Sequence, residues 1–225
     1  MKHKLVRKSV REFAEAELGP IAHEIDREAR FPLEVVGKMQ GLNFFGLQIP
    51  KRYGGAGMDS ISYAITVEEI SRVSGAVGLC ITVHNSVGVY PILKFGTEEQ
   101  IERFVPRLAS GEHIGAFCLT EANAGSDAGG VETNAFFDGN GYVINGTKIF
   151  VTNGGVCTAP LIFAVTNPEK KAGERACSSS RRARPALPWA RSKTCAACAR
   201  TLSRRSSSKT AACRRRTSSA GRETA

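Results

Sequence analysis

The spacing of apolar residues changes once along this chain, near residue 112, and that change limits the folds it can adopt. Before it, apolar residues recur every three or four positions, as in Ile101, Phe104, Val105 and Leu108, which predicts helices that pack by one face. After it, short segments alternate apolar and polar residues, which predicts strands. Helices first and strands second predict two segregated units and exclude a doubly wound βαβ fold.

Helix signals divide the first part into several segments. The first is expected to kink near Gly19-Pro20, and Thr97 with Gln100 forms a predicted capping box. Ser60 is expected to cap the third helix, with Ile61 on its inner side. The expected helices cover Lys4–Ala29, Leu33–Leu42, Ser60–Val73, Gly75–Leu93, which is apolar nearly all round, and a last one after Thr97.

Strand signals follow from His113 onward. The dipeptide Asn145-Gly146 between two alternating segments predicts a two-residue hairpin. The expected strands cover Ile114–Leu119, Thr133–Phe137, Tyr142–Ile144, Lys148–Thr152 and Leu161–Thr166.

Charge separates the last fifty-two residues from the rest. Residues 1–173 hold 17 Lys and Arg against 19 Asp and Glu, a net of −2, whereas residues 174–225 hold 14 against 2, a net of +12. This tail consists almost entirely of Arg, Ala, Ser, Thr, Pro and Cys, so it cannot bury enough apolar surface to offset the entropy of ordering. We expect it to be disordered, or to be the product of a frameshift, and to bind nucleic acid only non-specifically.

Cysteine usage and hydropathy indicate where the protein resides. The seven cysteines are an odd number, and the first three lie widely spaced in apolar stretches, which is typical of free thiols in a reducing compartment. No apolar run of membrane-spanning length and no signal peptide are expected. Residues 1–173 carry no cluster with metal-ligand spacing, and Cys195-Ala-Ala-Cys198 is a lone pair in the tail. The sequence predicts a cytoplasmic protein, or a mitochondrial-matrix protein if the source is eukaryotic, with no membrane partner and no metal site.

A run of small residues follows the first predicted strand, in the sequence F-C-L-T-E-A-N-A-G-S-D-A-G-G from Phe117. Such a run cannot fill a core, its glycines let a backbone approach a flat ligand, and the hydroxyls of Thr120 and Ser126 donate and accept hydrogen bonds. A plain loop leaving a strand is the alternative interpretation.

A second block makes the pattern specific. L-T-E-x-x-A-G-S-D, followed about twenty residues later by I-N-G-x-K-x-F-V-T-N-G, resembles the flavin-contacting region of the acyl-CoA dehydrogenase family over residues 3 to 170. The resemblance implies a helical N-terminal domain (1–112) and an incomplete antiparallel β-barrel-type middle domain (113–173). The family's C-terminal helical bundle is absent from the sequence, where the basic tail (174–225) stands instead.

The resemblance also implies an FAD site. Phe117, Leu119 and Thr120 would lie along the isoalloxazine ring, and Gly125 and Ser126 would line the diphosphate, with Ser126 also at the acyl-CoA entry. The other side of the flavin would be covered by Phe150, Val151 and Thr152, with Phe150 in a place often held by Trp. A purely structural hairpin is the alternative for these residues.

By the same resemblance, the reaction is α,β-dehydrogenation of an acyl-CoA, with hydride transfer to the flavin and an electron-transfer flavoprotein as acceptor, in a homo-oligomer. The family's base is a Glu, usually on the C-terminal domain, so no catalytic residue is assigned here and this chain alone is expected to be inactive. Glu68 and Glu69 are expected to be solvated or paired. Two alternatives are a flavin oxidase or monooxygenase on the same scaffold, and a non-catalytic protein that binds nucleic acid through its tail.

Overall fold

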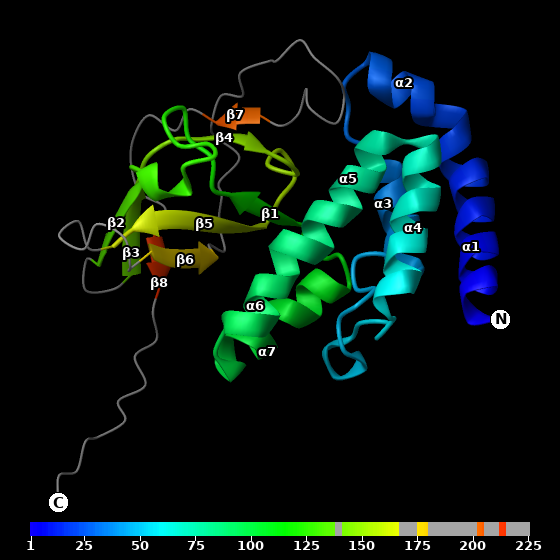
Figure 1. Cartoon of the computed structure of the whole chain (residues 1–225), viewed down its shortest axis with the longest axis horizontal. Helices are drawn as coiled ribbons and strands as arrows, with labels where there is room; N and C mark the ends of the chain where they lie inside the picture. Colours follow the sequence, from blue (N-terminus) through cyan, green and yellow to red (C-terminus); the bar gives the residue numbers. More distant parts are fainter. Residues whose placement is uncertain (138–140, 167–174, 180–201, 205–211, 215–225) are drawn as a thin grey trace, which may run out of the picture.

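The computed structural model describes residues 1–137, 141–166, 175–179, 202–204 and 212–214 (Figure 1). Within these residues, helices form the first part of the chain and strands the second, as the change of period predicts. The main helices are α1 (Lys2–Phe13), α2 (Ala22–Arg27), α3 (Leu33–Gly41), α4 (Ser60–Val73), α5 (Gly75–Val83), α6 (Tyr90–Phe95) and α7 (Glu98–Ala109).

The strands lie to one side of the helices (Figure 1). They are β1 (Gly115–Cys118), β2 (Asn134–Phe137), β3 (Gly141–Asn145), β4 (Lys148–Val151), β5 (Ala159–Val165), β6 (Arg175–Ser179), β7 (Leu202–Arg204) and β8 (Ala212–Arg214). Apart from the short strands β6, β7 and β8, the predicted low-complexity tail lies outside the described residues, as does Cys195-Ala-Ala-Cys198.

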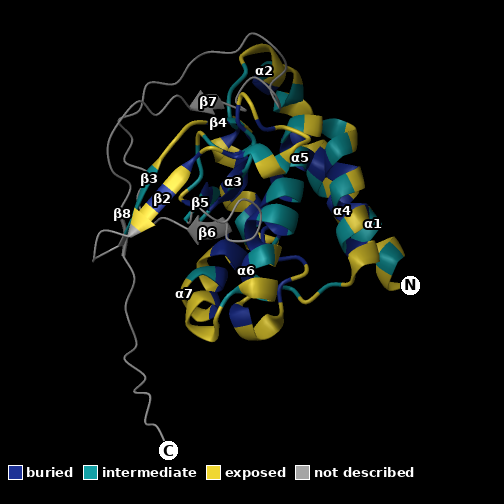
Figure 2. Cartoon of the chain, turned by 60° about the vertical axis from the view of Figure 1, so that its left-hand side comes forward, coloured by how far each residue is buried: buried dark blue, intermediate teal, exposed yellow. Residues whose placement is uncertain are grey.

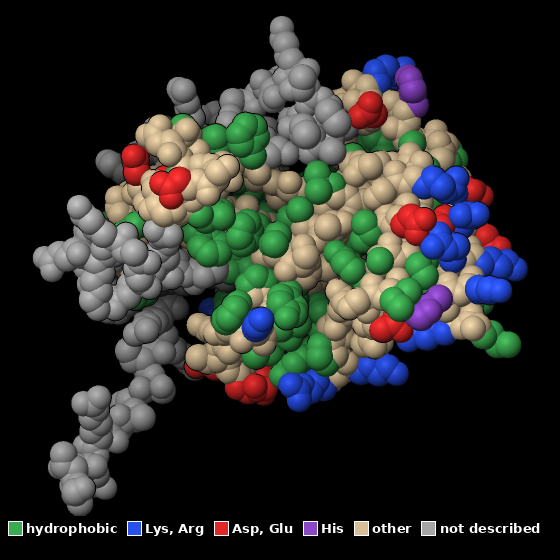
Figure 3. Space-filling view, in the orientation of Figure 1, with side chains coloured by type: hydrophobic (Ala, Val, Ile, Leu, Met, Phe, Trp, Pro, Cys, Tyr) green, Lys and Arg blue, Asp and Glu red, His purple; other side chains and the backbone are tan. Residues whose placement is uncertain are grey.

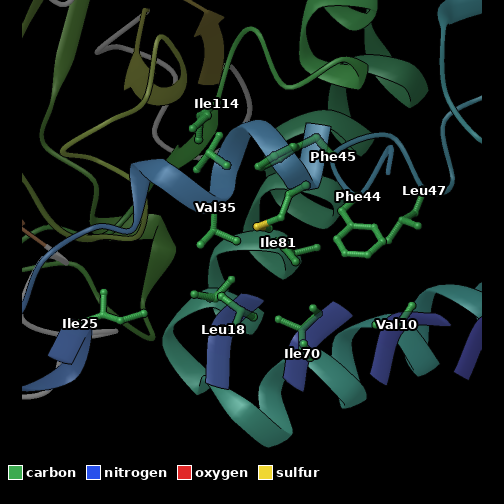
Figure 4. Close-up of a cluster of buried hydrophobic side chains, with 14 residues drawn as sticks. Val10, Leu18, Ile25, Val35, Phe44, Phe45, Leu47, Ile70, Ile81 and Ile114 are labelled. Atoms are coloured by element: carbon green, nitrogen blue, oxygen red, sulfur yellow. The ribbon is translucent and has the colours of Figure 1, made fainter. Parts of the chain in front are cut away.

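A cluster of apolar side chains holds the helices together (Figure 4). Val10 of α1, Ile70 of α4 and Ile81 of α5 meet there with Leu18, and each is at most 4% exposed. Val10 and Leu18 are eight residues apart, so they lie on one face of the helix. Burial of a side chain of this size stabilises the fold by about 1.5–3 kcal/mol.

The first turn of α4 differs from the prediction. Asp59, not Ser60, is the N-cap, and its carboxylate accepts a hydrogen bond from the Ser62 amide at 2.7 Å. Ile61 is exposed, so its predicted inner position is wrong. The buried face of α4 includes Glu69, because Arg11 of α1 donates to its carboxylate at 2.8 Å.

Two helices change type just before a proline. A π-helical segment (Ala14–Leu18) precedes Pro20, and another (His84–Val89) precedes Pro91. Proline cannot donate to the carbonyl four residues earlier and its ring crowds that carbonyl, so the helix widens or tightens locally. The irregularity predicted at Gly19-Pro20 is present as this π segment followed by a short 3₁₀ turn.

The helix Gly75–Phe95 runs through the middle of the fold as α5, a π segment and α6. It spans 21 residues with a mean hydropathy of 1.4, which by length and composition alone could cross a membrane, so the expectation that no apolar segment has this length is wrong. No residue from Ala76 to Val89 is exposed (Figure 2). Core helices of folded proteins have the same composition, and burial inside the fold explains it here.

The sheet around β5 is mixed. β5 pairs in parallel with β1 and β2, and antiparallel with β6, while β2 and β3 form an antiparallel pair. The predicted antiparallel barrel is therefore wrong for β5, whose parallel neighbours require longer connections than a hairpin supplies. The coarser prediction, helices followed by a β unit, is confirmed.

The predicted hairpin at Asn145-Gly146 is also wrong. β3 belongs to the sheet of β2, with Asn134 opposite Asn145, whereas β4 pairs with β7 in a separate two-stranded sheet. Gly146 instead serves a close approach: a Cβ there would lie 2.7 Å from the Cβ of Thr133. The glycine is needed for packing, and the chain leaves one sheet for another at this point.

The junction between helices and sheet is tight. A Cβ on Gly115 of β1 would lie 3.2 Å from the Cα of Gly88. One turn earlier, fully buried His84 accepts the Gly115 amide at Nδ1 and lies 3.0 Å from the Leu108 carbonyl through Nε2. Since Nδ1 accepts, Nε2 carries the proton and donates. Burial lowers the pKa of His84 to about 4, so the neutral ring joins α7, the central helix and β1.

Candidate functional site

β1 is the origin of the candidate site. Its side chains alternate, so Ala116 and Cys118 are buried against Val151 of β4. Phe117 lies half-buried on the other face, with its ring centroid 4.9 Å from that of Phe163. The predicted flavin residue Phe117 therefore takes part in the core beside β5.

The two sequence blocks lie side by side. The Ile149 amide donates to the Thr120 carbonyl at 2.9 Å, and Val151 packs against Ala116 and Cys118. Segments about thirty residues apart in sequence thus form one surface. Thr120 lies on it next to the strand that carries Phe150, and half-buried Thr152 follows that strand directly.

A buried ion pair joins these segments. Lys148 Nζ lies 2.6 Å from Glu121 Oε1 and donates to the Leu119 carbonyl at 2.9 Å; the two charged side chains are 9% and 7% exposed. Glu121 also accepts the amides of Glu132 at 2.7 Å and Thr133 at 3.0 Å. Burial opposes its charge, but the hydrogen bonds from Lys148 and Thr133 lower its pKa below the usual value.

Phe150 has an unusual backbone. Its φ is 54°, and its side chain is 71% exposed. The pairing of β4 with β7 shifts register between Lys148 and Val151, which is an irregularity of the bulge type. A left-handed conformation costs a non-glycine residue about 1–2 kcal/mol. The outward position of the Phe150 ring therefore lowers the stability of the fold.

Asn153 is a residue that the sequence-based site omitted. It is buried with φ 63°, and its side-chain amide donates to the Cys80 carbonyl at 3.1 Å and the Gly115 carbonyl at 3.2 Å. It therefore fastens the turn after Thr152 to both the central helix and β1. The only local signal is Asn before Gly154-Gly155, since Asn tolerates positive φ better than most residues.

Gly125 and Ser126 lie in the exposed loop after Glu121. Gly125 does not have a positive φ, and a Cβ there would meet nothing within 4 Å. Neither the backbone conformation nor packing within the chain therefore requires glycine at this position. A bridge between Glu121 and Ala124 and the Asp127 cap on the Gly129 amide at 2.9 Å shape this loop. Among the described residues, no hydrogen bond links Gly125 or Ser126 to β4.

The donor set suits a flat, partly polar ligand. Within the described part of the chain, the hydroxyls of Thr120, Ser126 and Thr152 make no hydrogen bond to another residue, while Phe150 offers an exposed ring. The free hydroxyls of Thr120 and Thr152, on the surface that also carries Phe150, suit the polar edge and apolar face of a flavin. The described residues contain no group of three or more His, Cys, Asp or Glu that could hold a metal ion.

Charged clusters elsewhere are structural. Glu68 pairs with Arg7 at 2.8 Å, and Glu69 with Arg7 and Arg11 across the α1–α4 contact. The Arg11 hydrogen bond lowers the pKa of Glu69 to about 2, against the effect of burial. In Figure 3 charged side chains gather over α1 and α4, whereas the surface between helices and strands is mostly apolar or uncharged.

Comparison with known proteins decides the family. The family model for the acyl-CoA dehydrogenase N-terminal domain matches residues 1–112, and that for the middle domain matches residues 116–193. The chain belongs to the acyl-CoA dehydrogenase family. Both candidate blocks, from Phe117 and from Lys148, fall within the acyl-CoA dehydrogenase middle-domain match.

Individual members of the acyl-CoA dehydrogenase family resemble the chain in sequence and structure. The short-chain specific acyl-CoA dehydrogenase of Clostridium acetobutylicum is 51% identical over 166 residues, which are 74% of this chain and 44% of that protein. The butyryl-CoA dehydrogenase structure of Megasphaera elsdenii gives a TM-score of 0.77 at 32% identity, covering 83% of this chain and 50% of that one. An acyl-CoA dehydrogenase of Bacillus anthracis complexed with FAD gives 0.72 at 29% identity, covering 84% and 32%. The chain spans less than half the length of the curated relatives it matches.

Proposed function

We propose that this protein is the N-terminal and middle portion of an FAD-dependent acyl-CoA dehydrogenase that oxidises short acyl-CoA thioesters between the α and β carbons. The observation that carries the proposal is the hydrogen bond between Ile149 and Thr120, because it joins the family's two flavin-contacting blocks into one surface. The short-chain preference is supported by relatives named as short-chain specific and butyryl-CoA dehydrogenases.

Each proposed site residue has a role that its chemistry supports. Leu119 and Thr120 border the flavin ring on one side, with the Thr120 hydroxyl free to hydrogen-bond a ring heteroatom, and Phe117 supports that border from the core. On the adjacent strand, the exposed Phe150 ring excludes water from the flavin and Thr152 adds a second hydroxyl, while Val151, buried against Ala116 and Cys118, supports that strand from the core. Gly125 and Ser126 form the exposed loop proposed for the diphosphate, and Ser126 for the acyl-CoA entry.

Bound FAD would supply the hydride acceptor for the β hydrogen of the substrate. The chain's own residues would hold the ring and exclude water while a carboxylate removes the α proton. Glu68, Glu69 and Glu121 are each engaged in an ion pair, so we assign none of them as that base. The proposed site on this chain therefore binds and orients the cofactor.

The wider proposal includes an electron-transfer flavoprotein as acceptor, a homo-oligomer, and a cytoplasmic or matrix location, all by family likeness. We further propose residues 1–112 and 113–173 as its two domains.

Reconstitution with FAD tests the proposal. The purified chain mixed with FAD and desalted is expected to keep a yellow flavin spectrum, and Thr120→Val with Thr152→Val is expected to lose most of it. A colourless product after reconstitution of a folded protein would refute the proposal. Turnover of butyryl-CoA with an electron-acceptor dye then tests whether this chain needs further residues for catalysis.

A further inference from the structure

The buried pair Glu121–Lys148 has more contacts than an ion pair needs for stability alone. Lys148 Nζ reaches Glu121 Oε1 at 2.6 Å and the Leu119 carbonyl at 2.9 Å, so one ammonium group bonds the residues on both sides of Thr120. Thr120 itself gives its carbonyl to Ile149, the neighbour of Lys148. Two consecutive residues of β4 thus hold residues 119–121, through the carbonyls of Leu119 and Thr120 and the carboxylate of Glu121.

Further donors tie the pair to the segment that directly precedes β2. Thr133 donates to Glu121 Oε1 through both its amide, at 3.0 Å, and its hydroxyl, and the Glu132 amide donates to Oε2 at 2.7 Å. Each carboxylate oxygen of Glu121 therefore has a partner. A fully satisfied buried network of this kind specifies one geometry, because any displacement leaves a charge unpaired.

Burial also makes the pair costly as a stabilising device. Taking two charges out of water offsets most of their attraction, so a pair of apolar residues of similar volume would stabilise about as well. A role in fixing geometry explains what stability alone does not. Burial lowers the pKa of Lys148, while Glu121 opposes that shift, in keeping with an ammonium that is held mainly by its hydrogen bonds.

We infer that Glu121 and Lys148 are positioning residues for the flavin: the pair holds the Thr120 segment in register against the strand that carries Phe150. This inference rests on the proposed function, since it assumes that the ring lies against the surface that these two hydrogen-bonded segments form together. Lys148 acts through the Leu119 carbonyl and the Thr120 backbone and does not touch the cofactor. The pair therefore controls how tightly and in what electronic environment the flavin is bound.

The test is FAD binding by the full chain carrying the double substitution Glu121→Gln with Lys148→Met. Removing both charges leaves no buried ion unpaired, so the variant is expected to fold with a circular dichroism spectrum like that of the unmodified protein. Loss of the donor to the Leu119 carbonyl is expected to raise the Kd for FAD about tenfold, the effect of one charge-assisted hydrogen bond. The absorption of the bound flavin should shift toward that of free FAD, and its reduction potential should change.

A control separates positioning from stability. Glu69→Gln weakens a buried network at the α1–α4 contact, away from the proposed flavin surface. It is expected to lower the melting temperature while leaving the Kd and the spectrum of bound flavin within twofold of the unmodified values. If the unmodified protein binds no FAD, the proposed function fails and this inference fails with it. If the unmodified protein and the double variant bind FAD with the same Kd and spectrum, the inference alone is overturned.

Discussion

Protonation of His84 is expected to weaken the joint between the helices and the sheet. The imidazole is fully buried, accepts the Gly115 amide and donates to the Leu108 carbonyl, and burial lowers its pKa from 6.5 to about 4. In the unfolded chain it titrates near its ordinary value. Between these two values the unfolded state binds more protons than the folded state, so stability falls as the pH falls.

The size of the effect follows from the two pKa values. With a folded value of about 4 and an unfolded value of 6.5, the contribution of His84 is complete above about pH 6.5. The free energy of unfolding should lose about 2 kcal/mol by pH 5 and about 3 kcal/mol by pH 4 from this residue alone. Below the folded pKa the loss levels off, because both states are then protonated.

Urea denaturation at pH 7 and pH 5 measures this loss. Protonation of carboxylates such as Glu69 also destabilises the fold in acid, so the control is His84→Gln. The glutamine side chain keeps a donor and an acceptor but does not titrate. His84→Gln is expected to be less stable than the unmodified protein at pH 7, by about 1–3 kcal/mol, and to lose about 2 kcal/mol less between pH 7 and pH 5. Equal losses in the two proteins would refute the reasoning.

Three further changes test other parts of the fold by urea denaturation. Thr97→Ala removes the capping box of α7, in which Thr97 and Gln100 exchange hydrogen bonds, and should cost about 1 kcal/mol; no change would mean that the box is not formed in solution. Gly146→Ala should cost about 2 kcal/mol, because the new Cβ meets Thr133, and a neutral result would contradict this close approach. Phe150→Asn should stabilise the apoprotein by about 1 kcal/mol, since Asn tolerates the φ of 54°, while FAD binding weakens; a loss of stability would show that the ring is needed for packing.

The local features were accessible from sequence because they depend on neighbouring residues. The change from helical to alternating spacing, the capping box at Thr97 and the order of helices before strands all follow from patterns a few residues long. The two motif blocks likewise carried the family resemblance, and the family matches confirm it. For Glu69 the sequence left two states open, solvated or paired, and the contact between α1 and α4 decides for the paired one.

Strand pairing and the contacts of the site depended on the tertiary structure. Asn145-Gly146 has the residues of a hairpin turn, yet β3 and β4 take partners from distant parts of the chain. The same holds for the Lys148 ammonium beside Glu121 and for His84 against Gly115, which are joined across 27 and 31 residues. Local propensity limits which elements form, but burial of charges and apolar surface selects among their arrangements, and that selection is made by the whole fold at once.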